Sequence, residues 1–215
     1  MNRSLGQRSA NEYFRAVSVA LAVLSTVVAA AVMGTTAHVF NVYRMQHEKN
    51  PWWLPYIPGA LNSSGTKVLI GTGAAVVFLN LIFVVASLAP KINIAARSTL
   101  HATLAAAVAL ISAMLAAAAV AYVVMLNKRL DHQETLETWT CRFQTDVAGP
   151  NLPNLSNTYS NREFDRLCKE SRFGFGAMVA VLCFQTFFLL SAVGQWVTRW
   201  SEPTRRTKES DSFSI

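Results

Sequence analysis

Charged residues are distributed unevenly along the chain, and four long stretches contain none of them. These stretches cover residues 16–43, 68–90, 98–127 and 173–198 and are 28, 23, 30 and 26 residues long. A helix needs about 20 residues to cross roughly 30 Å of hydrocarbon, and it satisfies its own backbone groups in lipid. The pattern therefore predicts an all-α integral membrane protein built as a bundle of four transmembrane helices.

Five polar segments flank the four predicted spans. They are a leader at 1–15, loops at 44–67 and 128–172, a link at 91–97 and a tail at 199–215. The first span has an alternative interpretation as a cleaved signal peptide, because a basic leader precedes it and Thr35, Thr36 and Ala37 offer a cleavage site. Signal cores are usually about 7 to 15 residues long, so a retained transmembrane helix is the better prediction.

The positive charges indicate which side of the membrane each segment faces. Lys and Arg exceed Asp and Glu by two in the leader, the first loop and the link and by one in the tail, and they balance in the second loop. Short loops that carry Lys and Arg stay in the cytosol, and the link carries Lys91 and Arg97 without an acid. We therefore expect both termini in the cytosol and both loops outside it, in the plasma membrane or an endomembrane.

Both predicted exterior loops contain an acceptor sequence for N-glycosylation. These are Asn62-Ser63-Ser64 in the first loop and Asn154-Leu155-Ser156 in the second, and such tripeptides predict surface positions in secreted segments. Asn62 lies only a few residues before the second span, close to the membrane. Asn154 is therefore the better candidate.

Two of the three cysteines lie in the second loop, on the side predicted to be oxidising. Cys141 and Cys168 are therefore predicted to form a disulfide, which would stabilise a loop of this length by about 3 to 4 kcal/mol. If the topology were inverted, two reduced thiols would be expected instead. Cys183 falls within the fourth span, where a thiol packs as a small apolar side chain.

The second loop is expected to contain two helical segments. The first continues the third span through residues 127–137, with Trp139 and Cys141 just beyond its end. A straight extension would lift Cys141 about 21 Å above the membrane, too far from Cys168, so it must bend or stop early, most plausibly after Leu136. Trp139 is expected to cover the disulfide, or alternatively to anchor a partner protein.

The second helical segment is expected to start at a capping box formed by Ser160 and Glu163. From Asn161 this helix would run nearly without interruption into the fourth span. It would place four residues along one stripe: Phe164, Leu167, Cys168 and Phe175.

The first loop contains three aromatic rings, Trp52, Trp53 and Tyr56, among three prolines. Prolines at this spacing exclude a helix, and Trp and Tyr prefer the level of the lipid headgroups. A loop that lies on the membrane surface is the simpler prediction. A groove for a lipid or another ligand, lined by these rings, is the alternative.

Polar residues inside the spans are few and uncharged. Five fall near the expected midplane: Ser25, Thr26, Asn80, Ser112 and Gln185. We expect Asn80, Ser112 and Gln185 to form hydrogen bonds between helices, although the same side chains could line a path for a solute. Two runs of small residues also predict close helix contacts: Gly71 with Ala75, and Ala105, Ala109, Ala113 and Ala117.

No sequence motif indicates a catalytic, cofactor or metal site. The spans contain no Asp, Glu, Lys or Arg, the residues that mark ion and proton paths in membranes, and no nucleophile, metal or phosphate motif is present. The pI of about 9.7 reflects Lys and Arg beside the membrane and does not predict a nucleic-acid surface. The expected partners are the lipid bilayer and another membrane protein or a second copy of this chain.

The arrangement of a small first loop, a tight cytosolic link and a larger cysteine-bearing loop resembles tetraspanins. The Cys-Cys-Gly motif of that family is absent, and claudin-like proteins carry their tryptophan and cysteine pair in the first loop, so no functional residue is transferred from either family. Trp139-Thr140-Cys141 and Leu167-Cys168-Lys169-Glu170-Ser171-Arg172-Phe173 also resemble stretches in uncharacterised four-span membrane proteins of filamentous fungi. That resemblance implies no established activity.

Taken with the missing motifs, this organisation predicts a membrane protein without catalysis of its own. It would act as an organiser or a partner-binding subunit through its larger exterior loop. Two alternatives are a small transporter or channel component, in which Ser112, Asn80 and Gln185 would line water, and an accessory subunit of a membrane enzyme.

Overall fold

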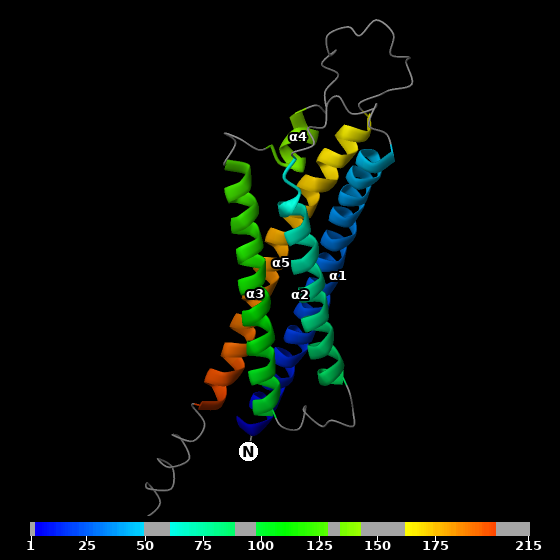
Figure 1. Ribbon diagram of the computed structural model, residues 1–215. Helices are drawn as coiled ribbons and strands as arrows, with labels where there is room; N and C mark the ends of the chain where they lie inside the picture. Colours follow the sequence, from blue (N-terminus) through cyan, green and yellow to red (C-terminus); the bar gives the residue numbers. More distant parts are fainter. Residues whose placement is uncertain (1–2, 50–60, 89–97, 129–133, 143–161, 201–215) are drawn as a thin grey trace, which may run out of the picture. The chain divides into compact units, whose positions relative to one another are not determined.

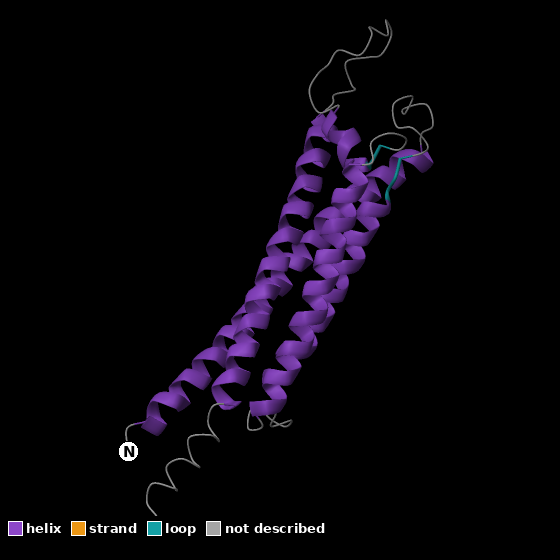
Figure 2. Cartoon of the chain, turned by 90° about the vertical axis from the view of Figure 1, so that its left-hand side faces the viewer, coloured by secondary structure: helices purple, strands orange, loops and turns teal. Residues whose placement is uncertain are grey.

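The computed structural model describes residues 3–49, 61–88, 98–128, 134–142 and 162–200, and these ranges are almost entirely helical (Figure 1). Four helices are long: α1 (Arg3–Lys49), α2 (Ser64–Leu88), α3 (Ser98–Lys128) and α5 (Arg162–Trp200). The fifth, α4 (Leu136–Arg142), has 7 residues. Figure 2 shows that helices account for nearly all of the described chain, which contains no β-strand in those ranges.

Each long helix contains a segment that is long and apolar enough to cross a membrane. The segments are Glu12–Met45, Ser64–Leu88, Leu100–Lys128 and Asp165–Val197. The prediction of four long apolar helices is therefore confirmed, and the described chain has the helical content of a multi-pass membrane protein.

The chain divides into two compact units, and every long helix contributes to both. Unit 1 comprises Met1–Val27, Val76–Met114 and Val181–Ile215, and unit 2 comprises Val28–Ala75 and Leu115–Ala180. The two units are described separately below.

Buried residues follow a regular spacing along the long helices. In α1 the buried positions alternate steps of four and three residues: Ser18, Ala22, Ser25, Ala29, Val32, Thr36 and Val39. The same alternation occurs in α2, at Leu69, Gly73, Val76, Asn80, Phe83 and Ser87. A mean spacing of about 3.5 residues is that of helices packed as in coiled coils. The buried stripe in both helices consists mainly of small, β-branched and polar residues.

The outward-facing positions of the long helices carry large apolar side chains. Phe78 of α2 is 65% exposed, Met114 of α3 is 65% exposed and Leu190 of α5 is 60% exposed. Several polar side chains are buried and many large apolar ones are exposed, which is the reverse of the usual distribution in a water-soluble protein.

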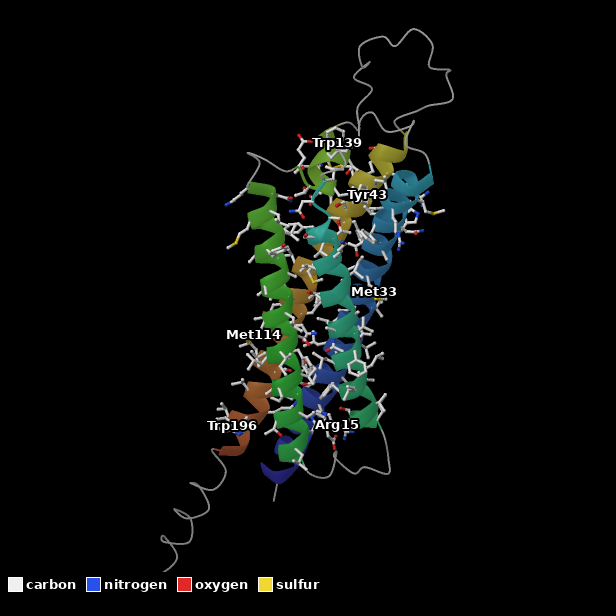
Figure 3. The ribbon with its side chains drawn as sticks, viewed as in Figure 1. Arg15, Met33, Tyr43, Met114, Trp139 and Trp196 are labelled. Atoms are coloured by element: carbon white, nitrogen blue, oxygen red, sulfur yellow. A yellow bond between two sulfur atoms is a disulfide. The ribbon has the colours of Figure 1, made fainter. Side chains whose placement is uncertain are left out.

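Unit 1 contains an apolar cluster to which all four long helices contribute. Phe83 and Phe188 are its two large residues, with ring centroids 5.0 Å apart. Alanines surround them: Ala22, Ala105, Ala109 and Ala192. At the end of α2 the guanidinium of Arg15 donates a hydrogen bond to the Ser87 carbonyl at 3.1 Å (Figure 3). This contact satisfies one of the carbonyls that a helix C-terminus leaves unpaired.

In unit 2 two glycines mark where helices approach closely. A Cβ on Gly73 would lie 3.2 Å from the Ala29 carbonyl oxygen, and one on Gly174 would lie 2.7 Å from Cγ2 of Thr36. Small residues let helix backbones approach in this way.

The predicted runs of small residues only partly match these contacts. A Cβ on Gly71 would meet no atom of the described residues within 4 Å, so the predicted Gly71 and Ala75 contact is wrong at Gly71. Ala105 and Ala109 are buried, but Ala117 is exposed and Ala116 is buried instead. A strict four-residue repeat drifts around a helix of about 3.6 residues per turn, so a buried stripe must include steps of three.

Candidate functional site

Around α4, unit 2 forms a compact structure that we call the stapled cap, comprising residues 61–63, 134–141 and 165–170. Its central helix α4 begins with a reciprocal pair of hydrogen bonds. Thr138 N–H donates to Thr135 Oγ1 at 3.2 Å, and Thr135 N–H donates to Thr138 Oγ1 at 3.0 Å. This arrangement is that of a capping box with threonine at both positions, and it satisfies N–H groups at the start of α4.

The disulfide of the stapled cap joins α4 to α5. Cys141 and Cys168 are bonded, and their Cα atoms are 4.8 Å apart. The predicted pairing is confirmed. Cys168 is almost completely buried, whereas the unpaired Cys183 is exposed on α5.

The predicted continuation of the third span through residues 127–137 is wrong. Helix α3 ends at Lys128 and α4 begins separately at Leu136. Asn127, in the last turn of α3, accepts a hydrogen bond from Thr135 Oγ1 at 3.0 Å and donates one to Glu137 at 3.2 Å. Thr135 and Glu137 thus contact the last turn of α3, and Trp139 and Cys141 lie within α4 and not after a helix end.

A small apolar cluster holds the stapled cap together. Its buried members come from α1, the segment before α2, α4 and α5: Val39, Leu61, Leu136 and Leu167. Trp139 and Tyr43 pack against this cluster (Figure 3). Trp139 thus packs on apolar residues of the stapled cap, while its predicted cover of the disulfide and its alternative role as a partner anchor both stay predictions.

Asn62 connects the first loop to the stapled cap. Its N–H donates to the Glu134 carbonyl at 3.1 Å, and the residue forms a bridge pair with Thr135. Its side-chain Oδ1 accepts from Ser64 N–H at 2.9 Å, at the start of α2. Asn62 thus has a structural role, and its glycosylation stays a prediction.

Several predicted residues lie outside the described part of the chain. These are Asn154, the rings of Trp52, Trp53 and Tyr56, and Ser160 and Asn161 of the expected capping box. Helix α5 begins at Arg162 and runs without a break for 39 residues, so the prediction of one continuous helix into the fourth apolar stretch is confirmed.

Charged side chains pair along α5 beside the disulfide. His38 of α1 lies 2.7 Å from Glu170, which also contacts Arg166 at 2.9 Å. Lys169 and Asp165 pair at 2.7 Å. The pairs one turn apart on α5 follow the ordinary helical spacing. The pairing of His38 with Glu170, 132 residues away, could not be read from spacing along the sequence.

Unit 1 brings together three of the polar residues expected near the midplane. Gln185 Nε2 donates to Ser25 Oγ at 2.8 Å and to Asn80 Oδ1 at 3.2 Å. All three are nearly or fully buried. Ser112 is also buried in this unit, but its hydroxyl has no hydrogen-bond partner among the described residues.

A second polar contact in unit 1 was not expected from the sequence. Ser18 lies 3.0 Å from the Ser191 hydroxyl and accepts from Gln195 Nε2 at 3.2 Å. Ser18 is seven residues before Ser25, so both lie on the same buried stripe of α1. That seven-residue spacing of serines within an apolar stretch is the signal that could have identified the contact.

The described residues contain no group of three or more His, Cys, Asp or Glu that could hold a metal ion. Comparison with protein-family models, with curated proteins and with solved structures found no match for this chain. Its resemblances to tetraspanins and to fungal four-span proteins therefore stay predictions.

Proposed function

We propose that the chain is a multi-pass membrane protein that acts as a partner-binding organiser through its stapled cap and has no catalysis of its own. Lipid contact is supported by the large apolar side chains on the outer faces of the long helices, such as Phe78 and Leu190. Exposed apolar surface on this scale destabilises a protein in water but not in hydrocarbon. After a carbonate wash the native chain should stay with the membrane pellet, and recovery in the supernatant would contradict the proposal.

In the proposed orientation, both termini and the 91–97 link face the cytosol. The stapled cap then lies on the opposite side, where a disulfide persists. The bonded state of Cys141 and Cys168 supports this assignment. Cysteine alkylation in sealed cells provides the test: labelling of Cys141 by a reagent confined to the cytosol would overturn it.

The observation that carries the binding proposal is the way α4 is fixed. It is joined to α5 by the disulfide, to the end of α3 by Asn127 and to the start of α2 through the Asn62 bridge. In the sequence, residues 143–161 join α4 to α5. A partner that binds at α4 therefore meets a helix whose position is already fixed. Such binding loses less conformational entropy than binding to an unconstrained chain.

The experiment compares complexes of three variants purified in mild detergent. A stoichiometric membrane partner, or a second copy of the chain, should accompany the wild type and Cys183→Ala. Cys141→Ala/Cys168→Ala should lose it at a temperature where all three remain folded. Retention of the same partner without the disulfide would contradict a role for the stapled cap. The identity of the partner would also show whether it is a membrane enzyme, as expected of an accessory subunit.

A transport function is distinguished by a second measurement. In reconstituted vesicles, an organiser should give no solute flux above that of empty vesicles. Flux that is present with the wild type and abolished by Asn80→Leu would overturn the organiser proposal.

A further inference from the structure

Each of the four long helices contributes one uncharged polar residue to the buried interior of unit 1. The residues are Ser25 of α1, Asn80 of α2, Ser112 of α3 and Gln185 of α5, and we call them the polar layer. All four are at most 1% exposed. Gln185 joins Ser25 to Asn80 by the hydrogen bonds described above.

The register of the helices places Ser112 on the same side of the apolar cluster of unit 1 as the other three residues. The apolar cluster of unit 1 contains Ala22, Phe83, Ala109 and Phe188, and each member of the polar layer lies three residues from one of these positions. Helices α1 and α5 are antiparallel, since Ser25 pairs with Gln185 and Ser18 with Ser191.

Helices α2 and α3 are antiparallel too, because Ser87 near the end of α2 contacts His101 near the start of α3, while Gly65 near the start of α2 lies beside Leu126 near the end of α3. Helices α2 and α5 are parallel, since Asn80 pairs with Gln185 and Phe83 with Phe188. Moving three residues forward along α1 and α3, or three residues back along α2 and α5, therefore leads in the same direction along the helix axes, by about 4.5 Å.

Hydrogen-bonding capacity in the polar layer exceeds the bonds that its members make with one another. Gln185 uses its Nε2 to reach both neighbours, so its Oε1 has no hydrogen-bond partner among the described residues. Within the same ranges, Asn80 Nδ2 and Ser112 Oγ have none either. The buried groups left over are thus one amide NH₂, one carbonyl oxygen and one hydroxyl.

Turning the amides over does not remove the excess. If both Asn80 and Gln185 are rotated, Gln185 Oε1 accepts from Asn80 Nδ2 and from the Ser25 hydroxyl. Asn80 Oδ1 and Gln185 Nε2 are then the groups without a partner. Rotating only one amide places two donors or two acceptors against each other, so every compatible arrangement leaves one donor and one acceptor.

We propose that the polar layer binds a single water molecule between Asn80, Gln185 and Ser112. Water offers two donors and two acceptors, and a buried water typically makes about three hydrogen bonds to otherwise unpaired groups. It would accept from the amide NH₂, donate to the carbonyl oxygen and bond the Ser112 hydroxyl. A cation fits the polar layer poorly, because none of its four residues is a carboxylate and its hard oxygen ligands are few.

The direct test is a crystal structure of the full chain grown from a lipid mesophase. An isolated density peak is expected within about 2.7–3.2 Å of one amide nitrogen and one amide oxygen of Asn80 and Gln185. The same peak should weaken or disappear in crystals of Asn80→Leu. The proposal is overturned if no peak is present at a resolution that shows ordered water elsewhere, or if both amides pair with other protein groups.

Thermal unfolding tests the part assigned to Ser112. The losses in Tm from Ser112→Ala and Asn80→Ala should not add in the double variant, because either change alone already removes a ligand of the shared water. Ser112→Ala combined with Ser18→Ala serves as the control, since Ser18 pairs with Ser191 at another level, and these losses should add. Additive losses in both combinations would exclude Ser112 from the water site. Crystals of the wild type test the contacts of the water with Asn80 and Gln185 without relying on any variant.

Discussion

The stapled cap and the polar layer are both built from polar contacts, but the contacts differ in kind. The stapled cap uses a disulfide, helix-capping threonines, a backbone bridge and side chains that carry charge, such as Glu170 with Arg166. The polar layer uses only neutral amides and hydroxyls. Charged groups at the centre of a bilayer would be costly even when paired, whereas neutral groups need only hydrogen-bond partners. The difference between the two regions is therefore the one expected under the proposed membrane insertion.

Removing the disulfide should have the largest effect and should be confined to the stapled cap. We expect Cys141→Ala/Cys168→Ala to lower the free energy of unfolding in detergent by about 3 to 4 kcal/mol. Without the bond, the unfolded chain between the two positions is no longer closed into a loop and gains conformational entropy. Thermal or denaturant unfolding followed by circular dichroism measures the change. Cys183→Ala is the matched control and should unfold like the wild type.

Removing the central amide of the polar layer should come second. Gln185→Leu leaves the Ser25 hydroxyl and the Asn80 carbonyl without their shared donor, at a cost of about 1 to 3 kcal/mol. The double variant Gln185→Leu/Asn80→Leu should recover part of this loss, because an orphaned carbonyl is removed. The wild type and Gln185→Leu should also be unfolded with and without a reducing agent, which tests whether the polar layer depends on the disulfide. The loss caused by Gln185→Leu should be the same in both conditions, and a loss that depends on reduction would contradict the separation of the two regions.

Adding one methyl group at a close helix contact should have an intermediate effect. Gly174→Ala brings a Cβ within 2.7 Å of Thr36 Cγ2, and the Thr36 hydroxyl is held by the Val32 carbonyl at 2.6 Å. Overpacking of this kind costs about 1 to 3 kcal/mol, of which helix propensity returns up to about 1 kcal/mol. Gly176→Ala lies on the same helix with nothing within 4 Å of the new Cβ. Its Tm should be unchanged or higher, and equal losses for the two variants would contradict the assigned contact.

Neutralising the pair between α1 and α5 should have the smallest effect. Glu170→Gln removes the carboxylate that His38 and Arg166 share, and partly exposed pairs contribute about 0.2 to 1 kcal/mol. The loss in Tm should shrink as salt is added, because exposed charges are screened. Asp165→Asn removes the neighbouring pair with Lys169 within α5 alone and provides the control. A loss from Glu170→Gln as large as that from the disulfide variant would show that charge, and not the covalent bond, dominates the stapled cap.

The sequence predicted those features that depend on local composition. The uncharged stretches indicated four long helices because a charged residue near the centre of a hydrocarbon segment is costly. Cys141 and Cys168 were the only cysteines outside these stretches, so their pairing followed by elimination once the loop was assigned to an oxidising side. The continuity of α5 followed from a helical pattern that reaches the fourth stretch without a proline.

The position of α4 could not be obtained in this way. Polar residues between Asn127 and Glu137 are compatible with a helix by composition, and the sequence favoured an extension of the third span. In the structure Asn127 bonds to Thr135 and Glu137 instead. In one continuous helix, residues 8 and 10 positions apart would not meet, so these bonds depend on tertiary contacts and not on helical periodicity.

The sequence by itself determined which four segments form long apolar helices, which cysteine pairing to expect and which polar residues lie within those segments. Only the tertiary structure decided which face of each helix is buried, and therefore that Gly73 and not Gly71 marks a close contact and that His38 meets Glu170. The physical reason is that both faces of a helix in these stretches are apolar. Hydropathy then varies little around the helix axis, so the buried stripe is distinguished by small and polar side chains whose partners lie on other helices.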